Sequence, residues 1–322
     1  MAESGLTVSK GEFAGTVCSH RRIGERFYRL GLEFSGTGAA AFAKTKPGQF
    51  AQIDLGGTPL PAAEAIPDEL ADAAERKILL RRPFSFFDVS AAGDRTRVEI
   101  LYSTLGPATL RMTSLKAGGS VSVIGPLGRG FSVPEGKKTA VLVVGGMGAG
   151  PLVHLAKVLT AEHPDIYVIA FAGAKTKKEL PFEKLLDAIS QGLGFSVREF
   201  ARYGIKSQTA TDDGSMGHEG PVTDCLSEWL VRHSRTVKDM IIYACGPEAM
   251  LAKVAEIAKG KNVDCQVSME RMMACGFGVC QSCAVQCKVN GSESSIYKLC
   301  CKDGPVFDAK EVAFSIKGKD KS

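Results

Sequence analysis

Seven of the ten cysteines in this 322-residue chain lie in the range 265–301. In a reducing compartment, where disulfides are rare, such clustering points to metal or redox chemistry. Cys275, Cys280 and Cys283 have the C-x4-C-x2-C spacing of a plant-type iron–sulfur loop, whose fourth thiolate comes from further along the chain. The spacing therefore predicts a small C-terminal unit that owes much of its stability to a bound cluster.

The glycines between these cysteines support the same interpretation. Gly276 and Gly278 have no Cβ, so the backbone can wrap closely round a cluster and aim N–H groups at its sulfurs. A zinc site is the alternative, and it usually takes two C-x2-C pairs. Here the second pair is replaced by the adjacent Cys300 and Cys301, so the spacing favours an iron–sulfur cluster.

Length and composition exclude several classes of protein. The chain is 44% hydrophobic and 23% charged, with a mean hydropathy of +0.02, so two or three globular domains are expected. Its net charge of +5 is spread along the sequence and does not indicate nucleic-acid binding. No segment approaches the roughly 18 apolar residues of a membrane span, and no secretory signal is recognised, so we expect a cytoplasmic protein.

Residues 1–135 are expected to form an antiparallel β-barrel. The segments GQFAQIDL, RVEILYS and SVSVIG are apolar or alternate in polarity, and Gly and Pro turns separate them. The stretch from Gly56 to Arg76 begins with turn residues and ends with a helical composition. We interpret it as a surface insertion in the barrel.

Residues 136–263 are expected to form an α/β domain with a parallel sheet. KTAVLVVGG indicates a buried strand, PLVHLAKVLTAE an amphipathic helix and DIYVIAFAGA a second strand. Further on, DMIIYACGP predicts another strand and AMLAKVAEIAKGK another helix. The remaining residues, 264–322, are assigned to the iron–sulfur unit, in which Cys265 and Cys287 are interpreted as ordinary buried thiols.

Two glycine-containing strand ends predict the place of a dinucleotide. The first strand of the α/β domain leads into Gly145, Gly146, Gly148 and Gly150, with Pro151 at the start of the helix. Such a turn lets a pyrophosphate approach the helix N-terminus, although alone it fits a structural turn equally well. A later strand ends at Cys245, Gly246 and Pro247. Both ends should reach the carboxyl edge of the sheet, where ligands of open α/β sheets bind.

The segment RPFS, from Arg82 to Ser85, is a weaker signal. An Arg on a barrel strand can hold a phosphate, and a nearby hydroxyl or amide can contact a flavin ring. Taken alone, Arg82 fits a solvated barrel residue and Phe84 a core residue equally well.

The order of these motifs resembles the ferredoxin-NADP reductase superfamily, and within it the electron transfer subunit of dihydroorotate dehydrogenase B. The resemblance rests on PGQF, RPFS, GPLGRGF, GGMGAGPL, TDDGSMG, ACGP and the cysteine loop, in that order. MACGFGVCQSC and CCKDGPVF are its most specific parts, and only the insertion after Gly56 lies outside it. The resemblance implies FAD in the barrel, NAD on the second domain and a 2Fe-2S cluster in the third.

The resemblance also implies site residues. The FAD contacts are expected at Arg82, Pro83, Phe84, Ser85, Leu101, Tyr102, Ser103, Ala108 and Thr109. The cluster ligands are expected at Cys275, Cys280, Cys283 and Cys301, with Cys300 as the alternative to Cys301. The chain departs from the family pattern, which usually has Arg at the position of Ser103 and Gly at that of Ala108. These changes remove a charge-assisted hydrogen bond and restrict the backbone.

The function that the resemblance implies is an electron relay with no acid–base residue of its own. Electrons would pass between a partner's flavin and NAD while dihydroorotate is oxidised to orotate in pyrimidine biosynthesis. The implied partner is an FMN-containing catalytic subunit, in a heterotetramer with two copies of each chain. The alternatives are a subunit that couples NAD(P)H to ferredoxin, sulfide or hydrogenase partners, a redox sensor without one cofactor, and a zinc-binding adaptor.

The choice between NAD and NADP depends on charges near two strand ends. Lys175, Lys177 and Lys178 follow the second strand of the α/β domain and would suit a 2′-phosphate, although such runs are usually solvated surface. Asp212 and Asp213 would suit a free ribose hydroxyl and repel a phosphate. The sequence therefore favours NAD.

Overall fold

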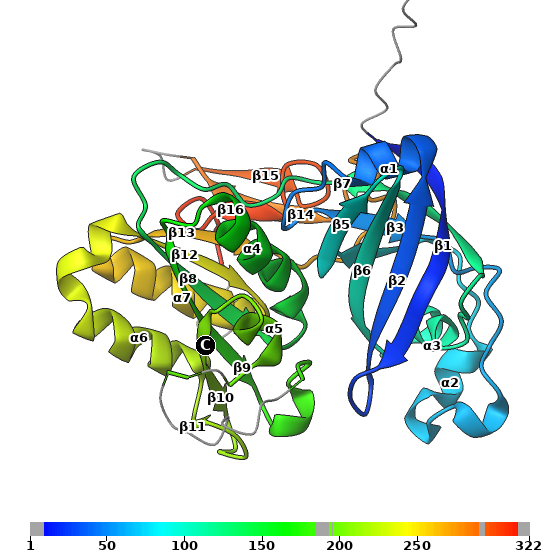
Figure 1. Ribbon diagram of the computed structural model, residues 1–322, viewed down its shortest axis with the longest axis horizontal. Coiled ribbons are helices and arrows are strands. Elements are labelled where there is room, and N and C mark those ends of the chain that lie inside the picture. The colour runs from blue at the N-terminus through cyan, green and yellow to red at the C-terminus, as the bar shows by residue number, and fades with distance from the viewer. Residues whose placement is uncertain (1–9, 184–192, 195, 290–293, 315–322) are drawn as a thin grey trace, which may run out of the picture.

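The computed structural model describes residues 10–183, 193–194, 196–289 and 294–314. Two large β-sheets lie beside each other, and a small C-terminal hairpin packs at one end of them (Figure 1). The chain forms the antiparallel sheet first, then the parallel strands of the second sheet and then the hairpin, and its last strand returns to the edge of the second sheet. This order of elements is the one that the sequence predicts.

The first sheet is antiparallel and has seven strands in the order β4-β3-β7-β1-β2-β6-β5. Their bounds are β1 Gly11–Arg22, β2 Phe27–Ser35, β3 Phe50–Ile53, β4 Arg82–Ser85, β5 Asp88–Ala92, β6 Arg95–Ser103 and β7 Ser120–Leu127. Alternate residues such as Val121 and Val123 are buried in its core. Within the described residues no ladder joins the edge strands β4 and β5, so the predicted antiparallel sheet is confirmed but forms a half-barrel rather than a closed one.

Three short helices accompany this sheet: α1 Gly36–Phe42, α2 Ala71–Glu75 and α3 Pro107–Met112. The predicted insertion contains α2 and the 3₁₀ turns η1 Ala63–Ala65 and η2 Asp68–Leu70. Leu70 and Ala73 from the insertion pack on Leu110 of α3 and form a small separate core. The insertion is therefore attached to α3, next to the residues predicted to contact FAD.

The second sheet has the order β11-β10-β9-β8-β12-β13-β16, and only β16 is antiparallel to its neighbour. The bounds are β8 Thr139–Gly145, β9 Tyr167–Ala174, β10 Lys206–Thr211, β11 His218–Glu219, β12 Met240–Cys245, β13 Asp264–Ser268 and β16 Val306–Asp308. The central strands read as continuous apolar runs because helices cover both faces. The predicted parallel sheet is thus confirmed.

The helices of this layer are α4 Ala149–Glu162, α5 Arg198–Ala201, α6 Val222–Arg232 and α7 Glu248–Lys261, with 3₁₀ turns η3 Gly146–Gly148, η4 Lys177–Glu179 and η6 Ser234–Asp239. Leu142 and Val144 of β8 belong to the core beneath α4. Val141 and Val143 belong to the core beneath α6 and α7. The two-residue period of the strand therefore supplies both cores.

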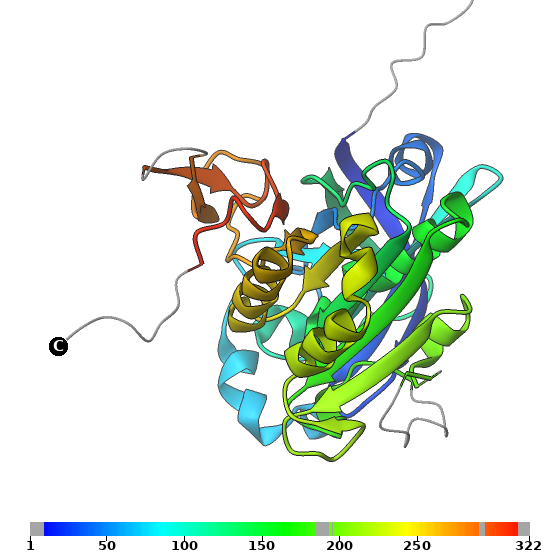
Figure 2. The same ribbon diagram turned by 90° about the vertical axis from the view of Figure 1, so that its left-hand side faces the viewer.

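The C-terminal hairpin consists of β14 Ala284–Lys288 and β15 Ser295–Leu299 and lies to one side of the sheets (Figure 2). Val285 and Val312 share one buried core with residues of the parallel sheet. β13 pairs with β12 along its length, so the sheet continues past the predicted boundary at residue 263, which stays a prediction. Cys265 and Cys287 are buried, as predicted.

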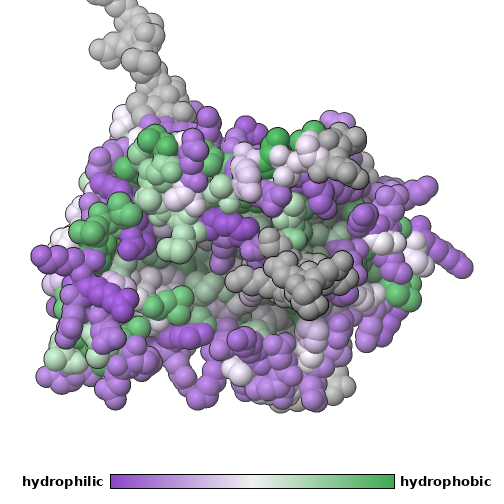
Figure 3. Space-filling model, turned by 180° about the vertical axis from the view of Figure 1, so that it is seen from behind, coloured by the Kyte–Doolittle hydropathy of each residue, from purple (hydrophilic) through white to green (hydrophobic). Residues whose placement is uncertain are grey.

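Charged and polar side chains, purple in Figure 3, cover most of the face seen from behind, and apolar ones lie in small groups between them. The helices of the described residues include none whose length and apolar character would let it cross a membrane.

Candidate functional site

The predicted dinucleotide edge is formed where β8 and β12 end side by side. From β8 the chain continues to β9 on one side of the sheet, and it later returns to β12 on the other side. This reversal is a topological switch point, at which ligands of open α/β sheets bind. All seven predicted residues of the two strand ends, Gly145, Gly146, Gly148, Gly150, Cys245, Gly246 and Pro247, lie here.

The two turns pack so closely that glycine is required. A Cβ on Gly148 would lie 2.0 Å from the carbonyl oxygen of Cys245, which is backbone and has no free rotation. Gly246 has φ +157°, and a Cβ there would lie 2.8 Å from Cα of Gly145. Part of this glycine pattern is thus explained by packing of the two turns, and a ligand is not needed to account for it.

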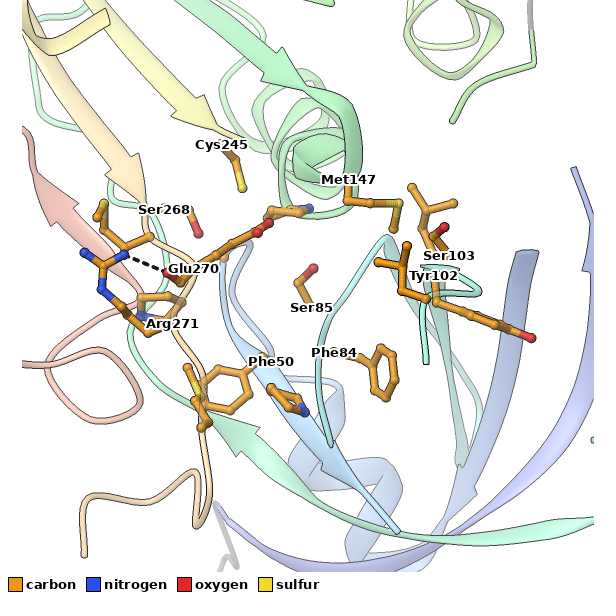
Figure 4. A pocket seen from close by; sticks show the side chains of 18 of the residues that line it. Phe50, Phe84, Ser85, Tyr102, Ser103, Met147, Cys245, Ser268, Glu270 and Arg271 are labelled. Atoms are coloured by element: carbon orange, nitrogen blue, oxygen red, sulfur yellow. Dashed lines mark hydrogen bonds between the residues drawn. The ribbon is translucent and has the colours of Figure 1, made fainter. Parts of the chain in front are cut away.

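A cavity of about 310 Å³ lies between this edge and the antiparallel sheet (Figure 4). Its lining includes Phe50, Pro83, Phe84, Ser85, Leu101, Tyr102, Ser103, Thr109, Met147, Cys245, Ser268, Glu270, Arg271 and Met273. The cavity therefore brings together predicted FAD residues from β4, β6 and α3 with the predicted nicotinamide side at Cys245. Mostly apolar walls with a few polar groups are typical of cofactor sites.

Two of the predicted FAD residues do not line this cavity. Ala108 is buried within α3, and the Arg82 guanidinium donates to the carbonyl oxygen of Leu80 at 2.7 Å. The Thr109 hydroxyl lies at the cavity but accepts hydrogen bonds from the backbone N–H groups of Leu105 and Gly106, at 2.9 and 3.1 Å. Its first role in the structure is therefore to cap the start of α3.

Several polar groups face the cavity. The Ser103 hydroxyl is buried and has no hydrogen-bond partner among the described residues, as expected of a group that awaits a ligand. Glu270 opens into the cavity, yet the protein packed around it raises the pKa of its carboxyl by desolvation. Burial also raises the pKa of the Cys245 thiol well above its usual range, so this thiol is neutral at pH 7 and a poor nucleophile.

Sequence reasoning missed one wall of the cavity, the segment from Ser268 to Met273. This segment connects the end of β13 to the cysteine loop, and its Arg271 guanidinium forms an ion pair with Glu248 at the start of α7, at 3.0 Å. Its letters, SMERMM, directly precede MACGFGVCQSC and share its resemblance to the family, but the sequence predicted no site role for them. Only its position between a sheet strand and the cysteine loop gives it access to the cavity.

The cysteine loop arranges its thiols in two pairs. The N–H of Cys280 donates to Sγ of Cys275, and the N–H of Cys301 donates to Sγ of Cys283, both at 3.4 Å. The Ser282 hydroxyl, followed by N–H contacts in the loop, lowers the pKa of the Cys280 thiol to about 6. Exposed thiols that lose their protons near neutral pH are suited to bind metal.

The fourth thiolate has two candidates, and the structure orients them differently. The Cys300 thiol is fully buried and donates to the carbonyl oxygen of Met269 at 3.3 Å. Burial, with a smaller contribution from the Cys283 thiol, raises the pKa of Cys301 to about 12. Both side chains are buried in the same core, but the Cys301 thiol interacts with the Cys283 thiol, whereas the Cys300 thiol donates to a backbone carbonyl.

The donor set fits a two-iron cluster. In such a cluster each iron takes two protein sulfurs, and the pairs Cys275 with Cys280 and Cys283 with Cys301 match this arrangement. Among the described residues no three Cys, His, Asp or Glu side chains form a group that could hold a single ion. Gly276 and Gly278, with φ +82° and +94°, give the loop the turns it needs to surround the thiols.

The charges that bear on dinucleotide choice also lie at the carboxyl edge. The N–H groups of Asp212 and Asp213 donate to the carbonyl oxygens of Ala174 and Lys175, both at 3.2 Å, so the ends of β9 and β10 are adjacent. The Lys178 ammonium pairs with Glu25 at 2.9 Å. This lysine is thus engaged by a carboxylate of the β1–β2 turn.

Comparison with known proteins gives two matches to family models and a set of relatives along most of the chain. The iron–sulfur cluster binding domain of dihydroorotate dehydrogenase B matches residues 270–313, and the oxidoreductase NAD-binding domain matches residues 142–256. The electron transfer subunit of dihydroorotate dehydrogenase B (NAD(+)) from Caldanaerobacter subterraneus subsp. tengcongensis is 34% identical over 298 residues, which are 92% of this chain and 97% of that protein. The chain belongs to this electron transfer subunit family.

Other members and a solved structure agree with this assignment. The electron transfer subunit from Bacillus caldolyticus is 36% identical over 300 residues, which are 92% of this chain and 96% of that protein. The structure of an NADH-dependent reduced ferredoxin-NADP oxidoreductase superposes with a TM-score of 0.68 at 26% identity, over 93% of this chain and 90% of that one. The ferredoxin reductase-like fold predicted from the motifs is thereby confirmed.

Proposed function

We propose that this electron transfer subunit relays electrons between a partner subunit and NAD while dihydroorotate is oxidised to orotate in pyrimidine biosynthesis. One observation carries the proposal: the segment 268–273 lines the cavity at the switch point and leads directly into the loop of Cys275. This connection supports a relay in which the proposed dinucleotide edge, flavin wall and cluster thiols lie close to one another in a single chain. When bound, FAD, NAD and a 2Fe-2S cluster supply the redox chemistry, with hydride transfer at one end and single-electron transfer at the other.

The residues of the chain hold and orient these groups. β4 and the end of β6, with Ser103, form the wall for the FAD ring, and α3 with Thr109 is assigned to the FAD phosphates. The turn 145–150 is assigned to the NAD pyrophosphate, and Cys245 with Gly246 is assigned to the nicotinamide side. Cys275, Cys280, Cys283 and Cys301 are assigned to the cluster.

NAD is proposed rather than NADP. Asp212 and Asp213 lie at the edge where the ribose is expected, and carboxylates repel a 2′-phosphate. The Lys178 ammonium pairs with Glu25 at 2.9 Å, and this carboxylate competes weakly with a phosphate because both side chains are exposed.

The partner is proposed to be the FMN-containing catalytic subunit, in an assembly with two copies of each chain. The exposed surface of the cysteine loop supports a docking role. Met272, Phe277 and Val279 on this loop are 90%, 52% and 73% exposed. Apolar side chains that are exposed together usually mark an interaction surface.

The test begins with the anaerobically purified chain. Its FAD, iron and acid-labile sulfide are measured, and NADH and NADPH are added separately while the visible spectrum is followed. The catalytic subunit, dihydroorotate and NAD are then combined with it, and NADH formation is recorded by its absorbance. We expect two irons and two sulfides per FAD, faster bleaching by NADH, and NADH formation that requires both chains.

A matched pair of cysteine variants controls the test. Cys275→Ser should lose the cluster and the two-chain activity, whereas Cys18→Ser, an exposed thiol on β1, should change neither. Two-chain activity that survives without the cluster would refute the relay. If the chain reduces a ferredoxin with NADH and no dihydroorotate is oxidised, the ferredoxin-linked alternative is favoured. The 26% identical structure is an example of that alternative.

A further inference from the structure

Gln52, in the middle of β3, is fully buried, and neither Nε2 nor Oε1 has a hydrogen-bond partner among the described residues. A buried amide with both polar atoms unpaired is rare, because the lost hydrogen bonds to water are not replaced. None of the roles assigned above uses this side chain. The unpaired amide of Gln52 therefore indicates a hydrogen-bond partner that a bound cofactor supplies.

The amide of Gln52 points toward the cysteine loop. A Cβ on Gly276 would lie 2.3 Å from Nε2 of Gln52 and 2.8 Å from its Cδ. Gly276 follows Cys275 directly and has φ +82°, so glycine is needed here both for the turn and for the approach of the glutamine. The amide thus lies against the loop that carries the first cluster thiol.

The face of β3 that carries Gln52 is the contact between the two parts of the chain. Ala51 and Ile53 point into the core of the antiparallel sheet. Phe50 points the other way and shares a core with Cys283 and Cys301. By the two-residue period of a strand, Gln52 is on the same face as Phe50.

We propose that Gln52 is a positioning residue that donates a hydrogen bond from Nε2 to a sulfur of the bound cluster on the Cys275 side. The proposal rests on the function proposed above. An N–H donor stabilises the reduced, more negative cluster and so raises its reduction potential. The backbone of Gln52 lies opposite Pro83 in the register of β3 and β4, so the strand that carries this side chain is paired with the flavin wall.

The test is a redox titration of the full chain with its cofactors, followed by electron paramagnetic resonance for the cluster and by absorbance for the flavin. Gln52→Met keeps the volume and removes both polar atoms, and Gln52→Leu also removes both polar atoms. We expect both to lower the cluster potential enough to shift the electron distribution between flavin and cluster at least tenfold. This corresponds to about 59 mV for a one-electron couple.

Gln286→Met is the matched control, because Gln286 is exposed on β14 and its amide donates to the Ser295 hydroxyl. It should leave the cluster potential unchanged. A change of less than twofold in the Gln52 variants, with iron and sulfide contents equal to wild type, would overturn the proposal. A wild-type chain without iron and sulfide would instead overturn the proposed function, so the two failures are distinguishable.

A second variant covers the case in which Gln52→Met is purified without its cluster. Gln52→Asn keeps the amide but retracts it by one methylene, so it should bind iron and sulfide and still lower the potential. If Gln52→Asn retains the wild-type potential, the hydrogen bond is not made and the proposal is wrong.

Discussion

The ion pair between Arg29 of β2 and Glu199 of α5 joins the two sheets and supports a sharp prediction. Their side chains are only 6% and 2% exposed. The Arg29 guanidinium also lies over the ring of Phe87, 4.0 Å from its centroid, and the N–H of Glu183 donates to Oε1 of Glu199 at 3.0 Å. Burial raises the pKa of Glu199 even with its partner present, so desolvation is a large term at this site.

Removing one member of this pair leaves the other charge buried and uncompensated, which costs about 3–5 kcal/mol. Arg29→Met should cost this much at pH 8 and less at pH 5, because the unpaired Glu199 can then take up a proton. Glu199→Met should show no such relief, since Arg29 stays charged. The double variant, with methionine at both positions, should recover most of the loss because two apolar groups need no partner.

The assay is calorimetry of the FAD-loaded chain, in which a loss of this size lowers Tm by roughly 5–10 °C. Arg232→Met is the control, because Arg232 and Glu228 are 72% and 59% exposed and such pairs contribute about 0–1 kcal/mol. The pair does not hold the sheets together as argued if each single variant loses under ~1 kcal/mol of unfolding free energy. The same holds if the loss in the double variant equals the sum of the losses in the two single variants.

Three further predictions follow from single contacts. Cys301→Ser should lose iron and sulfide, whereas Cys300→Ser should keep them, and metal analysis decides between them; the reverse result would exchange the ligand assignment. Gly148→Ala should lose at least ~2 kcal/mol and weaken NADH binding, because its Cβ would lie 2.0 Å from a backbone carbonyl. Gly260 lies in α7, and an added Cβ there would have nothing within 4 Å, so Gly260→Ala should instead gain ~0.5–1 kcal/mol of stability. Calorimetry and NADH titration measure both variants, and equal effects of the two substitutions would contradict the prediction. His154 is buried and its pKa is lowered to about 4 by desolvation, so only the unfolded chain takes up its proton between pH 6.5 and 4. Stability should therefore fall by about 3 kcal/mol over that range relative to His154→Leu, and parallel curves of Tm against pH would contradict this.

Much of the fold was predictable because its signals are local. The runs in β8, β9 and β12 are apolar over lengths typical of buried strands, and the helix between the first two has the matching period. The half-barrel was harder to predict, because closure depends on whether the two edge strands, β4 and β5, form hydrogen bonds with each other. Local patterns carry no information on that pairing.

The site divides in the same way. The geometry of an iron–sulfur cluster sets the spacing of the cysteines that bind it, so the spacing of Cys275, Cys280 and Cys283 can be recognised in the sequence alone. The sequence predicted no site role for Ser268–Met273 or for Gln52, because their importance comes from what packs against them.

The sequence by itself determined the kinds of element, their order, the thiol spacing and the family to which the motifs belong. Only the tertiary structure decided which of Cys300 and Cys301 faces the other thiols, and which residues meet at the switch point. It alone brought the amide of Gln52 against Gly276. The physical reason is that backbone propensity and spacing act over a few residues, whereas burial and unpaired hydrogen-bonding groups arise from contacts between segments that are distant in the sequence, such as Gln52 and Gly276.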